Sequence, residues 1–229
     1  MNNDDRGMIL EFKSFINNRE FPCVAAKAAL ERQQVTCMVA DHMACPKDDK
    51  AILQFLYNFI YSYRKAAAFF YSAAVIFKGP VLQSEGMFDS LLWQRLQSLS
   101  DLDAKSNNYD NRVDADPHSP NFSFSLKEEA FFIIGLNPVS SRPSRQFKFP
   151  ALVFNPHAQF EQLRETNRYE KMKNIVRKRD VAYSGSVNPM LDDFGTSSEV
   201  FQYSGLKHDH SWQCPLMINH AKNEHHSSS

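Results

Sequence analysis

His157 stands where the amino-acid sequence changes from an apolar segment to a helical pattern. Residues 149–154 (FPALVF) have the apolar character of a short strand, and Asn155 and Pro156 follow them. Asn is a favoured N-cap residue and Pro suits the first helical position, so we predict that a helix begins here with His157 in its first turn. Unpaired N–H groups and the positive end of the helix dipole disfavour an imidazolium there, which leaves the ring able to bind a metal or a proton. A histidine that only hydrogen-bonds a neighbouring loop is the simpler interpretation of the same pattern.

Cys23 is the second residue that could bind a metal. It follows Phe21-Pro22, at the predicted start of a strand over residues 23–30. Histidine imidazole and cysteine thiolate are both axial ligands of protein hemes, and a thiolate pushes electron density onto the iron and favours O–O cleavage. A cysteine buried as a small hydrophobe is the commoner case. From the residues alone both stay open as metal ligands, with His157 placed first because of its position at the predicted start of a helix.

Arg142 and Arg145 lie in the segment SRPSR, between two predicted strands. Planar guanidinium groups at this spacing can bind carboxylates through paired hydrogen bonds. The carboxylates would be those of a bound cofactor or substrate. A solvated loop surface is the alternative, and we weigh the two about evenly.

The segment KHDHSWQCPLMINH contains further possible zinc or copper ligands, namely His208, His210, Cys214 and His220. Structural zinc sites usually have paired ligands two to four residues apart in two clusters, and only the first two histidines approach that spacing. We expect Cys214 to be buried as part of the core. His118, in the DPHSP motif of a polar segment, is one more candidate ligand.

The composition disfavours several common functions. Because 26 Lys and Arg balance 26 Asp and Glu, no net charge attracts nucleic acid or an anionic membrane. The phosphate-binding motifs GxxxxGK[ST] and GxGxxG and the GxSxG motif of serine hydrolases do not occur in the sequence. Four cysteines without a close CxxC pair, together with the polar start MNNDDRG, predict a reducing cytoplasm. The longest apolar run, at 66–77, is shorter than the roughly 20 residues that cross a bilayer, so we expect no transmembrane helix.

Hydrophobic periodicity predicts helices and strands along most of the chain. Ile52, Phe55, Phe59 and Tyr63 recur at three- and four-residue steps, which is typical of an amphipathic helix. The predicted elements are, in chain order, a helix at 6–18, a hairpin of strands 23–30 and 34–41, a helix from 48, a strand at 69–77, a helix capped by Ser84, a long loop at 101–119, a hairpin of strands 121–126 and 129–136, a strand at 149–154, a helix at 157–180 and a C-terminal arm beyond 180 with little regular structure.

This order of elements predicts an α+β fold, in which a mixed β-sheet packs with amphipathic helices in a single domain and an extended C-terminal arm follows. A chain of 229 residues with 19 Phe can fill one hydrophobic core. We place the domain at residues 1–206 and a C-terminal tail at 207–229.

Several segments together resemble the YqcI/YcgG family, in their order and spacing as well as in residue type. They are FPC at 21–23, FKGP at 77–80, the SE…F…LW run at 84–93, DPHSPNFSFS at 116–125, AFFIIGLNPVSSRPSRQF at 130–147, FNPHAQFE at 154–161 and QYSG at 202–205. Within that family the likeness is greatest to a branch of heme-dependent N-hydroxylases that act on arginine or arginine-derived guanidines.

The resemblance implies heme b as cofactor, with His157 as the first choice of iron ligand and Cys23 a near equal. It implies a monooxygenase that hydroxylates a nitrogen of arginine or a related guanidine, working with O2 or peroxide and, where needed, an electron donor. A guanidinium substrate requires carboxylates, and Asp192, Asp193 and Glu199 are the candidates, although an exposed acidic turn would have the same sequence. The alternative is a non-catalytic heme- or metal-binding protein, a sensor or carrier, with the same fold.

Overall fold

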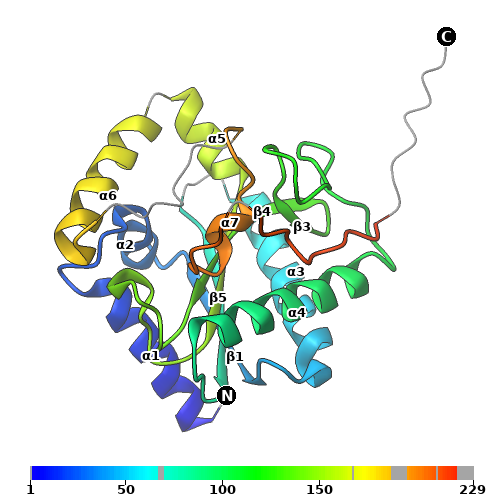
Figure 1. Ribbon diagram of the computed structural model, residues 1–229, viewed down its shortest axis with the longest axis horizontal. Helices are drawn as coiled ribbons and strands as arrows, with labels where there is room; N and C mark the ends of the chain where they lie inside the picture. Colours follow the sequence, from blue (N-terminus) through cyan, green and yellow to red (C-terminus); the bar gives the residue numbers. More distant parts are fainter. Residues whose placement is uncertain (1, 67–69, 167, 187–194, 210, 221–229) are drawn as a thin grey trace.

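The computed structural model describes residues 2–66, 70–166, 168–186, 195–209 and 211–220, and its centre is a mixed sheet (Figure 1). The strand order is β1 (Val35–His42), β2 (Ser72–Gly79), β5 (Ala151–Pro156), β4 (Glu129–Leu136) and β3 (Phe124–Leu126). The β1–β2 pair is parallel and the three remaining pairs are antiparallel. With its helices this sheet confirms the predicted α+β fold.

Helices cover both faces of the sheet, as Figure 1 shows. α1 (Asn3–Asn17) and α2 (Val24–Glu31) pack on one face, whereas α3 (Asp49–Lys65) and α4 (Glu85–Asp103) pack on the other. The chain then adds α5 (Ala158–Glu165) and α6 (Tyr169–Ser184) on the side of α2, and the short α7 (Val200–Tyr203). Each face of the sheet therefore has its own hydrophobic cluster.

The sequence of β2 explains why the sheet is buried on both faces. Side chains alternate along a strand, so Val75 and Phe77 face the cluster of α3 and α4, while Ala74 and Ile76 face the cluster of α1. All four are at most 1% exposed. Such a continuous apolar run is typical of a strand covered by helices on both sides.

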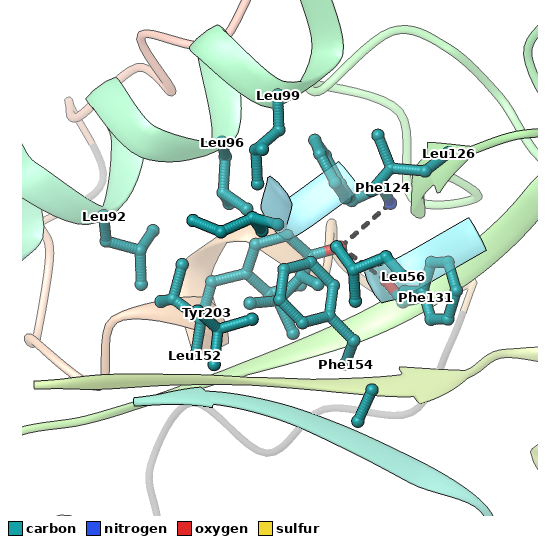
Figure 2. Packing of buried hydrophobic residues seen from close by; sticks show 14 of the residues in the cluster. Leu56, Leu92, Leu96, Leu99, Phe124, Leu126, Phe131, Leu152, Phe154 and Tyr203 are labelled. Atoms are coloured by element: carbon teal, nitrogen blue, oxygen red, sulfur yellow. Dashed lines mark hydrogen bonds between the residues drawn. The ribbon is translucent and has the colours of Figure 1, made fainter. Parts of the chain in front are cut away.

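β4 approaches α4 unusually closely at Gly135. A Cβ atom there would lie 2.7 Å from Cε1 of Phe88 and 2.9 Å from Cδ1 of Leu92. Figure 2 shows the side of α4 that makes this approach, with Leu92, Leu96 and Leu99 directed toward the sheet. Because interiors are close-packed, glycine at this position lets α4 lie directly on the strand.

Tyr203 ties α7 to the strands through its hydroxyl group, which lies between Phe124 and Phe131 in Figure 2. The hydroxyl accepts a hydrogen bond from the Phe124 amide at 3.1 Å and lies 3.4 Å from the Phe131 carbonyl oxygen. The side chain is fully buried. α7 thereby carries residues 199–205 to the end of the sheet where β5 leads into α5.

The predicted hairpin of strands 23–30 and 34–41 is wrong in its first half. Residues 24–31 form α2, and β1 pairs in parallel with β2 instead. The segment VAAKAALE is rich in Ala and Leu, which favour helix, and the Cys23 Sγ accepts a hydrogen bond from the Ala26 amide as an N-cap. The helical propensity of the alanines therefore outweighs the apolar run.

The predicted helix start at Asn155 is also wrong. β5 continues through Pro156, and His157 is the N-cap residue of α5, without a side-chain capping bond. The Asn155 side chain bonds across the sheet, since its Oδ1 accepts from Ser72 Oγ and its Nδ2 donates to the Phe132 carbonyl. The helix predicted at 157–180 is interrupted, so that α5 ends at Glu165 and α6 begins at Tyr169.

The remaining elements follow the prediction more closely. Ser84 caps α4 by accepting from the Met87 amide, and β3 and β4 form the expected hairpin across Lys127 and Glu128. The C-terminal arm runs along α4, where Gln97 bonds both the amide and the carbonyl of Met217. Within the described ranges, no helix is both long and apolar enough to cross a bilayer.

Candidate functional site

A cavity of about 280 Å³ lies on the face of the sheet that α1 and α2 cover. Its floor consists of side chains of β4 and β5 that share one face, among them Phe132, Ile134, Val153 and Asn155. α1, the start of α2, α5 and α6 form its walls. The lining is mainly apolar, with a small number of polar and charged groups, which is the usual character of a ligand site.

Cys23 enters this cavity at the N-terminus of α2. Its Sγ lies 3.4 Å from the amide nitrogen of Ala26. Burial raises the pKa of the Cys23 thiol, and the hydrogen bonds from the amides of Ala26 and Ala25 act in the opposite direction. Those amides would stabilise a thiolate once a metal ion displaced the thiol proton.

His157 lines the same cavity at the junction of β5 and α5 and is 6% exposed. Its backbone amide donates to the Ala130 carbonyl at 2.8 Å, which fixes the junction on β4. Nδ1 lies 3.4 Å from Oε1 of Glu199, and Nε2 lies 3.2 Å from Oε1 of Glu161. The ring is thus placed between a buried carboxylate and a half-exposed one, an environment that the sequence pattern did not predict.

Glu199, one of the predicted substrate carboxylates, is 5% exposed and also lines the cavity. Its Oε2 accepts a hydrogen bond from Ser123 Oγ at 2.9 Å and lies 3.3 Å from the Tyr203 hydroxyl. Its other oxygen faces His157. The carboxylate can therefore orient the imidazole, in the way that outer-shell carboxylates orient metal-binding histidines, or accept a cation from a ligand.

The two predicted arginines have partners within the protein. Arg145 follows the turn of Pro143–Arg145, and its guanidinium donates to the carbonyls of Gly135, Tyr203 and Gln202 at 3.2, 3.0 and 2.6 Å. Burial lowers the pKa of Arg145 to about 10. Arg142 donates from Nη2 to Oδ2 of Asp180 at 2.6 Å.

Arg145 and Asp180 line the cavity, so the SRPSR segment lies at its edge. The hydrogen bonds of Arg145, however, hold α7 and β4 together, and Arg142 holds α6. Asp192 and Asp193, the other predicted substrate carboxylates, lie outside the described residues.

Sequence reasoning missed the cationic side of the cavity, which α5 and α6 supply. Arg164, Lys173 and Arg177 line it together with Met172 and Val176. The segment was predicted to be helical, and its basic residues resembled a solvated helix face. The available signal was a four-residue spacing, since Arg164 follows Phe160, Lys173 follows Tyr169 and Arg177 follows Lys173 by four residues each.

His208 and His220 of the C-terminal segment lie apart from this cavity. His208 stacks on Trp212 and bonds Asp89 at 3.2 Å, and His220 bonds the buried Asp103 at 2.8 Å. Cys214 is buried, as predicted. His210 lies outside the described residues, and the part of the chain that the structure describes contains no group of three or more potential metal ligands.

His118, the further candidate ligand, is exposed and bonds Asp116 at 3.1 Å.

The YqcI/YcgG family matches residues 12–217. One relative is the "Uncharacterized protein YqcI" of Bacillus subtilis (strain 168), which is 26% identical over 208 residues that cover 86% of this chain and 81% of the relative. No solved structure is significantly similar. The matched range includes every residue that lines the cavity.

Proposed function

The chain belongs to the YqcI/YcgG family, and we propose that it is a heme-dependent monooxygenase that hydroxylates a nitrogen of arginine or a related guanidine. One observation carries the proposal: the two residues competent to bind heme iron, Cys23 and His157, come from distant parts of the chain and line one mainly apolar cavity. The likeness of the sequence to heme-dependent N-hydroxylases supplies the type of reaction.

The residues of the cavity fit heme b in their chemistry. A heme site needs an axial donor, an apolar surround and cations near the propionates. Cys23 or His157 would hold the iron, and Arg164, Lys173 and Arg177 bring positive charge to the α5–α6 side. The volume of about 280 Å³ lies just below the range of ligand sites, about 300–1,000 Å³. Binding of a heme macrocycle therefore requires the cavity to widen.

The surroundings of the two donors favour Cys23 over His157 as the ligand. Both ring nitrogens of His157 face carboxylate oxygens, so iron binding would displace one of these contacts. The Cys23 Sγ faces two backbone amides that would stabilise a thiolate. This reverses the order that the helix-start pattern predicted. His157, oriented by Glu199, is then placed to hold or move a proton at the edge of the site.

The charges of the cavity suit an amino acid with a guanidinium group. Glu199 and Asp180 offer carboxylates for the cationic end, and Lys173 and Arg177 offer cations for the α-carboxylate.

Bound heme supplies oxygen transfer to the nitrogen, which requires two electrons and two protons per O2 or, alternatively, peroxide. We expect a reducing cytoplasm as the compartment, because Cys23 must stay a thiol to bind iron.

Expression with a heme precursor tests the proposal. The purified protein should show a Soret band and contain about one iron per chain, and mass spectrometry should detect arginine or an analogue with one added oxygen. Absence of both the Soret band and iron would refute it. A Soret band without turnover would favour the non-catalytic alternative, a heme carrier or sensor. One observation supports that alternative. Glu199 and Asp180, the carboxylates proposed to bind the substrate cation, already have partners within the protein.

Replacing Glu199 by Gln tests its part in binding the substrate cation. The variant keeps the size of the side chain and the hydrogen bonds to Ser123 and Tyr203 but loses the charge. A charge-assisted hydrogen bond is worth roughly 1.5–3 kcal/mol, so we expect KM for the guanidine to rise about 10- to 100-fold. Heme content should stay unchanged. Steady-state kinetics with an arginine analogue that lacks the positive charge provide the control, because its KM should not respond to the substitution.

A further inference from the structure

The turn that precedes Cys23 combines hydrogen bonds of its own with hydrogen bonds from side chains of other elements. Between α1 and α2 the Phe21 amide donates to the Asn18 carbonyl at 3.0 Å, and the Glu20 amide donates to Asn18 Oδ1 at 2.9 Å. The carbonyls of Arg19 and Phe21 accept from side chains instead. These side chains therefore decide how the turn is oriented.

Arg179 of α6 donates to both of those carbonyls. Its Nη2 lies 2.6 Å from the Arg19 oxygen and 3.1 Å from the Phe21 oxygen. Lys27 Nζ donates to the Arg19 oxygen as well, at 2.9 Å. The pKa of Lys27 is lowered, first by burial and then by the charge of Arg179, so two cations converge on one carbonyl in spite of their repulsion.

A second contact fixes the same turn from the other side. The Phe21 ring is 7% exposed and lies against Phe15 of α1, with ring centroids 5.2 Å apart. The ring thus anchors the turn to α1, while Arg179 attaches its backbone to α6. Cys23 follows two residues later, and its Sγ is the cap of α2 within the cavity.

α6 is also a wall of the cavity. Val176 and Asp180, which flank Arg179 in the helix, line it. We propose that Arg179 is a positioning residue for Cys23: by holding the carbonyls of Arg19 and Phe21 to α6, it sets the direction in which the thiol faces the cavity. The inference rests on the proposed function for the role of Cys23 as iron ligand, but the positioning itself exists without heme.

Alkylation of the heme-free protein with iodoacetamide tests the positioning directly. The rate at each cysteine is followed by mass spectrometry of its proteolytic peptide. In Arg179→Gln we expect Cys23 to react about tenfold faster, because the freed turn lets the thiol leave the cap of α2; a tenfold change corresponds to about 1.4 kcal/mol. Arg179→Lys, which can reach one carbonyl, should give an intermediate rate. Lys178→Gln removes a charge from the exposed neighbouring position and should leave the rate unchanged.

Cys37 and Cys214 serve as internal references in the same samples. Faster alkylation of all three cysteines would indicate general destabilisation and would overturn the proposal, as would an unchanged rate at Cys23. The heme-loaded variant gives a second measurement: Arg179→Gln should shift the Soret band or weaken heme binding, and Lys178→Gln should do neither. Failure of the parent protein to bind heme would refute the proposed function, whereas the alkylation result would still decide the role of Arg179.

Discussion

Cys23→Ala should abolish heme binding or strongly shift the Soret band, and His157→Ala should keep the heme. An outer-shell partner of a metal ligand contributes about 10- to 100-fold to metal affinity, and loss of the ligand itself should exceed that range. Cys23 faces backbone amides that would stabilise a thiolate, whereas the ring nitrogens of His157 face Glu199 and Glu161. Heme titration followed by absorbance measures the affinity of each variant.

Cys37→Ala is the matched control, because Cys37 is another half-buried free cysteine and is not part of the cavity lining. Circular dichroism of each variant establishes that it is folded. The opposite pattern, with loss of heme in His157→Ala alone, would restore the order that the sequence suggested. Parent-like spectra in both variants would exclude both residues and make His118, in the DPHSP motif, the next ligand to replace.

The sequence predicted the elements that depend on local periodicity. The stripe of Ile52, Phe59 and Tyr63 became the buried side of α3, and the two apolar runs around Lys127 and Glu128 became the β3–β4 hairpin. These predictions succeeded because the apolar pattern directly reflects which side chains are buried. In a strand every second side chain faces the core, and in a helix every third or fourth does.

The junction before His157 shows where local rules fail. Asn155 and Pro156 have the chemistry of a helix start, but β5 pairs Asn155 with Phe132 and Pro156 with Phe131. Pairing with β2 ends at Phe154, so the missing N–H of Pro156 interrupts no hydrogen bond on that side. Strand pairing is a long-range interaction, and the local sequence contains no signal for where it ends.

Sequence reasoning singled out Cys23 and His157, which line one cavity, but missed the charged residues around them. Cys23 and His157 stood out individually, because few residue types bind iron, but their common cavity follows only from the order of the strands. An arginine that binds a ligand and one that binds backbone carbonyls look alike in sequence. Arg145 binds backbone carbonyls in the structure. Two of them belong to Gln202 and Tyr203 of the QYSG motif, which is distant from Arg145 in sequence.

Arg145→Ala should destabilise the fold by about 3–5 kcal/mol whether or not heme is present. The guanidinium is 6% exposed and donates to three backbone carbonyls, and each buried acceptor left without a donor costs about 1–3 kcal/mol. Urea denaturation of the heme-free protein measures the change in the free energy of unfolding. Arg168→Ala, at an exposed arginine before α6, is the control and should change that free energy by less than about 0.5 kcal/mol.

Gly205, which packs against the Arg145 side chain, provides a second test of the structural role of Arg145. It has φ +84°, and a Cβ atom there would lie 2.6 Å from Cδ of Arg145. Gly205→Ala should therefore destabilise the heme-free protein as well, because strain at the positive φ adds to displacement of the guanidinium. Arg145 would instead hold propionates or a substrate carboxylate if Arg145→Ala kept the parent stability but lost heme, or kept heme and raised KM. Since its donors already face the Gly135, Tyr203 and Gln202 carbonyls, we expect loss of stability to come first, with heme lost only in proportion to the unfolded fraction.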